Sequence, residues 1–214
     1  MNIQLKNPSN LPFVFFLMIG LIWSLVYPFA YNYVETFVIG LLITLLLFGF
    51  EGLKELFDKM KAPFWFPLFV FIMLHLIDSF YMTVARQSTG NGHLFDHTSI
   101  HHFDNLHGLF EKVWVAGRFL FSAVNEELLM IPIVLMIYNL LKRTRTGWYI
   151  ASFCSAILFA FLHFTVYELN AWIFVGLAFG RLVFNELFRL TGSIRAPMYV
   201  HFLNDATVLL VWML

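Results

Sequence analysis

The sequence predicts an all-α protein, a polytopic transmembrane helical bundle of about seven or eight helices. The first observation behind this prediction is composition: 60% of the 214 residues are hydrophobic and only 12% are charged, and the mean hydropathy is +0.78. A soluble domain carries about a quarter charged residues. The second observation is a series of apolar runs close to the roughly 20 residues that a helix needs to cross lipid.

Seven such runs divide the chain, and we expect residues 1–214 to form a single membrane-embedded domain. The runs are Leu11–Ala30, Val34–Phe50, Phe64–Val84, Val113–Leu141, Trp148–Phe164, Ala171–Leu190 and Ala196–Leu214. The fourth run is long and contains charges, so it can also be divided into an interfacial helix and a span, which gives eight helices. The first run is too long for a signal-peptide core and has no clear cleavage site after it, so we expect a mature helix.

The basic residues between the runs predict the orientation of the chain in the cell membrane. They precede the first run, separate the second from the third, follow the fourth and precede the seventh: Lys6, Lys54, Lys59, Lys61, Lys142, Arg143, Arg145 and Arg195. All these positions lie on one side if the N-terminus is cytoplasmic. We therefore expect a multi-pass protein of the cell membrane with a cytoplasmic N-terminus.

The remaining bulk properties define few partners besides the lipid bilayer. The formal net charge is zero, and we expect no nucleic-acid partner. Cys154 is the only cysteine, which excludes an intramolecular disulfide.

Polar residues inside the apolar runs define the candidate site. An ionisable side chain in hydrocarbon costs a few kcal/mol or more, so each one requires an explanation. The fourth run contains Asn125, Glu126 and Glu127, the fifth contains His163, and the seventh contains His201, Asn204 and Asp205. Glu126 and Glu127 are about 100° apart around a helix, so only one can face a given cavity. We expect these groups to converge on one water-accessible cavity, with the second glutamate contacting a neighbouring helix.

Three short motifs within residues 125–205 resemble the CAAX-protease and bacteriocin-processing (CPBP) family, which includes the type II CAAX prenyl proteases. That family carries EExxxR, FxxxH and HxxxN/D motifs in its membrane helices. The corresponding segments here are Glu126 to Ile131, Phe159 to His163 and His201 to Asp205. The resemblance implies a glutamate-type intramembrane endopeptidase that needs no cofactor and cleaves a membrane-associated peptide or protein tail.

The resemblance also implies roles for the candidate catalytic residues. Glu126 and His163 would hold and activate a water, and His201 would form the oxyanion side with Asn204 or Asp205. Glu127 would be structural or a proton partner. Such roles fit the chemistry of peptide hydrolysis, which needs an activated water and donors aimed at the developing negative charge.

One position departs from the family pattern, because Ile131 stands where the first motif has arginine. Either another residue supplies the positive charge, with Arg118 and Arg181 as the candidates inside the apolar runs, or the chain has lost activity. The second possibility is a non-catalytic membrane scaffold or binding protein of the same fold.

Two further interpretations involve metal. Glu, His and Asp side chains in a bundle can hold zinc or another divalent metal, but the runs contain no Glu-x-x-His or His-Glu-x-x-His spacing, so a metal-dependent membrane enzyme is the less favoured alternative. Segment 93–107 holds five of the eight histidines. We interpret it as an interfacial loop in preference to a metal-binding or pH-sensing segment.

Overall fold

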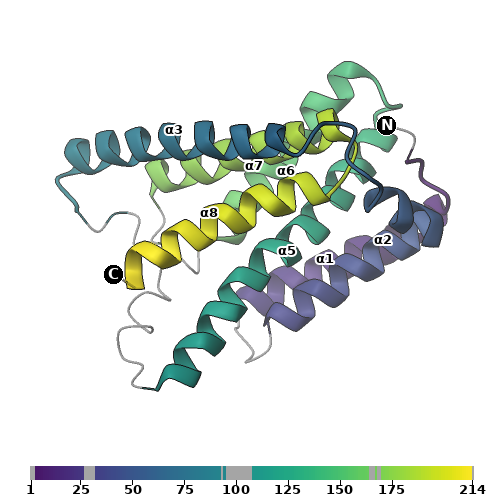
Figure 1. Ribbon diagram of the computed structural model, residues 1–214. Helices are drawn as coiled ribbons and strands as arrows, with labels where there is room; N and C mark the ends of the chain where they lie inside the picture. The colour runs from purple at the N-terminus through teal and green to yellow at the C-terminus, as the bar shows by residue number, and fades with distance from the viewer. Residues whose placement is uncertain are drawn as a thin grey trace.

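Seven α-helices form the computed structural model of the chain, which describes residues 3–26, 32–92, 94, 108–163, 167 and 170–213 (Figure 1). The helices are α1 (Leu11–Val26), α2 (Asn32–Leu56), α3 (Trp65–Thr89), α5 (Leu109–Leu140), α6 (Arg145–Leu162), α7 (Ala171–Thr191) and α8 (Arg195–Met213), with a short 3-10 helix, η1 (Pro8–Asn10), before α1. No strand occurs in the described residues. The prediction of an all-α bundle is confirmed, and the fourth apolar run forms one continuous helix, α5.

Five of these helices are long and apolar enough to cross a membrane: α2, α3, α5, α6 and α7. Large apolar side chains also cover the outside of the bundle, as on α3, where Phe69 is 53% and Phe80 73% exposed. Side chains of this kind are stable in lipid and costly in water. The chain is therefore a multi-pass membrane protein.

Helix α5 is the central element, because it packs against α2 on one side and against α6 and α8 on the other. In Figure 1 it runs diagonally between the α1–α2 pair and the group formed by α3, α6, α7 and α8. Its segment from Glu127 to Met136 is buried throughout, whereas Leu109 and Phe110 at its first turn are about 80% exposed. The glutamate pair thus lies at the start of the most enclosed part of the bundle.

A proline and a glycine bring α2 and α5 into close contact beside the glutamates. Pro132 has no N–H, so the carbonyl of Leu128, four residues earlier in α5, lacks its helical donor. Gly40 of α2 packs on this carbonyl: a Cβ at position 40 would lie 2.9 Å from the Leu128 oxygen, closer than real Cβ atoms approach. The missing side chain at Gly40 therefore permits the observed helix spacing.

The second predicted run is longer than its apolar pattern indicates. We expected it to end at Phe50, but α2 continues to Leu56. The backbone is non-helical at Gly49 (φ 68°, ψ −176°), and this left-handed φ is readily available to glycine. The added turns carry charged residues such as Glu51 and Lys54, which a hydropathy pattern alone assigns to a loop.

A tight connection fixes the start of α8. The turn begins at Gly192, whose φ of 68° is left-handed and whose N–H donates to the Phe188 carbonyl at 2.8 Å. The next two residues bind the end of α2 and the residues that follow it: Ser193 Oγ donates to the Asp58 carbonyl at 2.6 Å, and Ile194 N–H to the Leu56 carbonyl at 2.8 Å. These bonds define where α8 enters the bundle and therefore where its motif residues lie.

Candidate active site

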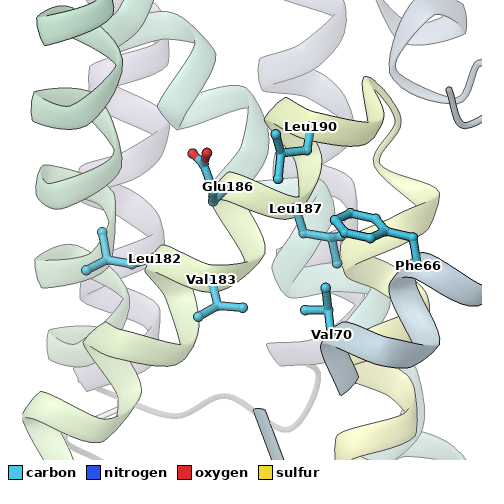
Figure 2. A pocket seen from close by; sticks show the side chains of 7 residues that line it. All are labelled: Phe66, Val70, Leu182, Val183, Glu186, Leu187 and Leu190. Carbon is cyan, nitrogen blue, oxygen red and sulfur yellow. The ribbon is translucent and has the colours of Figure 1, made fainter. Parts of the chain in front are cut away.

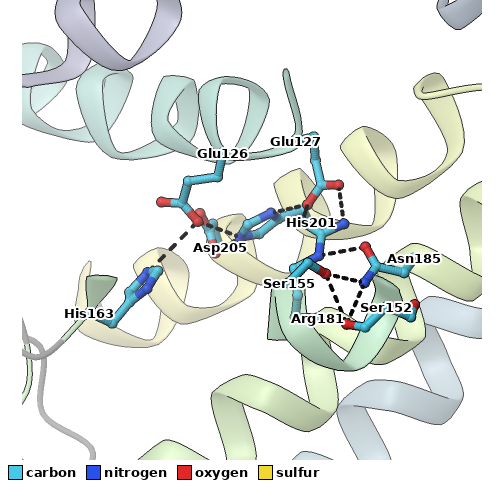
Figure 3. A network of polar contacts seen from close by, with 9 residues as sticks. All are labelled: Glu126, Glu127, Ser152, Ser155, His163, Arg181, Asn185, His201 and Asp205. Atoms are coloured by element: carbon cyan, nitrogen blue, oxygen red, sulfur yellow. Dashed lines mark hydrogen bonds and ion pairs between the residues drawn. The ribbon is translucent and has the colours of Figure 1, made fainter. Parts of the chain in front are cut away.

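The motif residues of three helices meet in one cluster (Figure 3). Glu126 of α5 is at its centre: its Oε2 lies 3.8 Å from Nε2 of His163, which caps the end of α6, and 3.5 Å from Nε2 of His201 in α8. Asp205 Oδ1 lies 3.9 Å from the same His201 nitrogen. The expected convergence is present in the structure.

The contacts of Glu126 are loose and partly accessible. Its side chain is 24% exposed, compared with 17% for His163 and 15% for Asp205. Separations of 3.5–3.9 Å are longer than direct hydrogen bonds, but one water can bridge two groups at such a distance. This side of the cluster can therefore accept a small polar ligand.

A hydrogen bond at Nδ1, the second ring nitrogen of His163, fixes the orientation of the ring. Nδ1 lies 2.8 Å from the carbonyl oxygen of Phe159, one helical turn earlier. Since a carbonyl only accepts, Nδ1 carries the proton in the neutral ring, and Nε2 is left as an acceptor that faces Glu126.

Glu127, by contrast, is fully buried and tightly bound. Both of its oxygens accept hydrogen bonds from Arg181 of α7, Nη1 to Oε1 and Nη2 to Oε2, each at 2.8 Å. His201 Nδ1 lies 2.9 Å from Glu127 Oε1. An ionised carboxylate only accepts, so Nδ1 donates to it, and His201 presents Nε2 to Glu126 and Asp205.

A second set of polar side chains, from α6 and α7, continues this network away from Glu126. Arg181 Nε donates to Asn185 Oδ1 at 3.0 Å, and Asn185 Nδ2 donates to Ser155 Oγ at 2.7 Å and to the Ser152 carbonyl at 3.3 Å. Sequence reasoning did not find Asn185 or the serines. A signal was available, because Arg181 and Asn185 are four residues apart on one face of an apolar helix.

Two phenylalanines pack between the histidines and the arginine. Phe159 lies 4.3 Å from the His163 ring and 5.7 Å from the Arg181 guanidinium, measured to ring centroids. Phe184 stacks on His201, with centroids 4.8 Å apart and an angle of 29°, and lies 5.5 Å from the same guanidinium. These rings limit rotation of both imidazoles and screen the buried cation from water.

Tyr167, in the connection after α6, is a site neighbour that sequence reasoning missed. Its ring is stacked on His163 at 6.4 Å with an angle of 27°, and its N–H donates to the His163 carbonyl at 3.0 Å. Burial, together with the negative charges of Asp205 and Glu126, raises the pKa of the Tyr167 hydroxyl, which therefore stays protonated at neutral pH.

The structure separates two predicted alternatives. Asp205 contacts His201, whereas no side-chain hydrogen bond or ion pair joins Asn204 to the part of the chain that the structure describes. Ile131 is completely buried in the apolar core, and the cation beside the glutamates is Arg181 and not Arg118. The histidine-rich segment 93–107 lies outside the described residues, except for Leu94.

Within the described ranges, no group of three or more His, Cys, Asp or Glu side chains is arranged to hold a metal ion.

An apolar pocket of about 280 Å³ lies apart from this cluster, between α3 and α7 (Figure 2). Its lining residues are Phe66, Val70, Leu182, Val183, Glu186, Leu187 and Leu190. Glu186 is the one charged residue of this lining, and it is held by Trp148 Nε1 at 3.3 Å and by Arg189. No candidate catalytic residue lines the pocket.

Comparison with known proteins identifies the part of the chain that holds the cluster. Residues 109–207 match the family model described as type II CAAX prenyl endopeptidase Rce1-like. Helices α5 to α8 form a Rce1-like segment. This match confirms the resemblance to the CPBP family, and the segment contains every residue drawn in Figure 3. No curated protein and no solved structure matches the chain.

Proposed function

We propose that this chain is an intramembrane endopeptidase that cleaves a membrane-associated peptide or protein tail with a water held by Glu126 and His163. The observation that supports this proposal is the 3.8 Å separation of Glu126 Oε2 from His163 Nε2. Both atoms are acceptors, so together they can bind the two protons of one water and leave its lone pairs free to attack. The match of residues 109–207 to the model of type II CAAX prenyl endopeptidases supports the same activity.

In the proposed reaction, the water oxygen attacks the carbonyl carbon of the scissile peptide bond and Glu126 takes the released proton as general base. Glu126 then gives this proton to the leaving amine as the C–N bond breaks. The carbonyl oxygen becomes an oxyanion in the tetrahedral intermediate. His201, protonated at Nε2 and donating through Nδ1 to Glu127, donates a hydrogen bond to this oxygen. Asp205, 3.9 Å from Nε2, favours the protonated ring.

The principal alternative is a non-catalytic scaffold of the same fold. The isoleucine at position 131 favours this alternative, because it leaves the first motif without its cation. The contact between Arg181 and Glu127 weakens this argument, because a guanidinium does lie beside the glutamate pair.

The substrate can be sought in cells. Membrane proteomes of cells with and without the protein would be compared. Cells that lack the protein would then be complemented with either the wild type or the Glu126→Gln variant. We expect Glu126→Gln to accumulate the same uncleaved precursor as the deletion, because glutamine cannot take up the proton; purified protein should lose at least about a hundredfold in cleavage rate. Glu111→Gln is the matched control, since Glu111 lies in the same helix, exposed and near its first turn.

Two results would replace the proposal. Full complementation by Glu126→Gln, His163→Ala and His201→Ala alike would show that hydrolysis is not the function and would favour the scaffold. Loss of cleavage in chelator, restored by one added metal, would favour the metal-dependent alternative.

A further inference from the structure

We propose that Arg181 is a positioning residue that supplies, from α7, the cation that the first motif lacks in α5, and that it acts through Glu127 to hold His201 with Nε2 facing Glu126. This inference rests on the proposed function. The Arg181 side chain is fully buried and does not touch the substrate, and through it a chain with isoleucine at position 131 retains a complete site.

The location of Ile131 shows why the cation cannot come from α5. Its side chain is 0% exposed and belongs to the main apolar core, with Ile133 and Met130 as core neighbours along the helix. Arg181 approaches the glutamate pair from α7 and is also 0% exposed. The chain thus replaces a motif residue by one that lies 54 positions from Glu127 in the sequence.

The geometry of Arg181 is that of a fixed group. A buried ion pair stabilises a structure only where its geometry is good and its remaining donors are satisfied. Here both terminal nitrogens bind the two Glu127 oxygens at 2.8 Å, and Nε binds Asn185 at 3.0 Å. Asn185 is in turn fixed by Ser155 at 2.7 Å. Lysine cannot reproduce this planar, three-point arrangement.

Arg181 affects His201 because both side chains bind the same oxygen of Glu127. Glu127 Oε1 accepts from Arg181 Nη1 at 2.8 Å and from His201 Nδ1 at 2.9 Å. The guanidinium keeps Glu127 ionised, and an ionised carboxylate requires the proton of His201 on Nδ1. A carboxylate buried without a counter-charge is costly and tends to take up a proton. Without Arg181, Glu127 would therefore no longer be the ionised acceptor that fixes His201 through Nδ1. The same logic applies to the carboxylate–histidine pairs of other hydrolases, where the carboxylate sets tautomer and orientation.

The test compares Arg181→Lys and Arg181→Met with Arg118→Lys, the same conservative change at an arginine in α5 away from the network. With the substrate found as above, we expect Arg181→Met to lower kcat about a hundredfold or more and Arg181→Lys about tenfold. KM should stay within about twofold in both. Arg118→Lys should keep wild-type kcat.

A readout without substrate separates this inference from the proposed function. Nitrogen-15 NMR of labelled histidine in the full-length, detergent-solubilised protein distinguishes the doubly protonated ring from the two neutral tautomers, with His201→Gln assigning the signal. We expect wild-type His201 to carry protons on both Nδ1 and Nε2, as the proposed hydrogen bond to the oxyanion requires, and Arg181→Lys to show a mixture with neutral rings. Unchanged kcat and an unchanged His201 signal in a folded Arg181→Lys protein would overturn the role. If Glu126→Gln kept its activity while the His201 signal still responded to Arg181, the proposed reaction would fail and the positioning role would stand.

Discussion

The two adjacent glutamates of α5 differ in almost every physical respect. Glu127 is 0% exposed and forms three contacts of 2.8–2.9 Å with Arg181 and His201. Glu126 is 24% exposed, and its histidine neighbours lie at 3.5 and 3.8 Å. Their directions differ because successive helical residues are about 100° apart. Glu127 is thus fixed by its partners, while Glu126 is loosely surrounded, as the general base of the proposed reaction would need to be.

The comparison is tested most strongly by the same substitution at both positions. Glu127→Gln leaves the guanidinium of Arg181 buried without a counter-charge, so we expect it to lower the free energy of unfolding by about 3–5 kcal/mol. Glu126→Gln breaks no contact shorter than 3.5 Å and should change it by less than about 1 kcal/mol. Reversible unfolding of the purified proteins in SDS measures both. Equal losses at the two positions would remove the distinction between them.

The next largest effect is expected from restoring the family arginine. Ile131→Arg places a second cation in the apolar core, where Glu127 is already paired with Arg181. We expect a loss of about 3 kcal/mol, measured in the same way, because a buried unpaired charge is not compensated. Ile131→Met is the control of similar volume and should cost less than about 1.5 kcal/mol. A stabilised Ile131→Arg protein would indicate that Arg181 leaves the glutamates in need of further positive charge.

Local patterns predicted most of this fold, and three-dimensional packing decided the rest. The seven helices could be predicted because each one is marked by its own run of apolar residues. The convergence of the polar residues could be predicted because each of them would be costly to isolate in lipid. The sequence alone does not decide whether Arg181 or Arg118 is the cation beside the glutamates, because that depends on how α7 packs beside α5. The choice of Asp205 over Asn204 depends on the rotation of α8, which adjacent residues do not reveal.

The Tyr167 contact was missed for a different reason. It lies in a connection, where no helical periodicity marks the side chains that turn towards the site. Likewise, the polar ladder of Asn185 and Ser155 joins two helices through residues 30 positions apart. Sequence spacing identifies pairs on one helix face, but it does not identify partners on different helices.

A smaller effect is expected where α2 supports the glutamate helix. In Gly40→Ala the new methyl group would lie 2.9 Å from the Leu128 carbonyl oxygen and 3.0 Å from its carbon. Both atoms are backbone, so α2 and α5 must separate, which should cost about 1–3 kcal/mol. Gly20→Ala is the matched control in α1, because no atom lies within 4 Å of a Cβ there. A Gly40→Ala protein as stable as the control would show that the helix contact yields without cost.

The smallest effect is expected from the hydroxyl of Tyr167, on the accessible side of the cluster. Tyr167→Phe keeps the ring that stacks on His163 at 6.4 Å and removes only the protonated oxygen near Glu126 and Asp205. Loss of this one polar group should cost about 1 kcal/mol or less in stability and about two- to tenfold in cleavage rate. Tyr167→Ala also removes the ring and should reduce the rate further, because His163 then loses a stacking partner on one face. Cleavage rates of the two purified variants give the comparison. If Tyr167→Phe matched the wild type in cleavage rate and Tyr167→Ala did not, Tyr167 would act on His163 through its ring alone. The functional polar groups on the accessible side of the cluster would then be Glu126, His163 and Asp205.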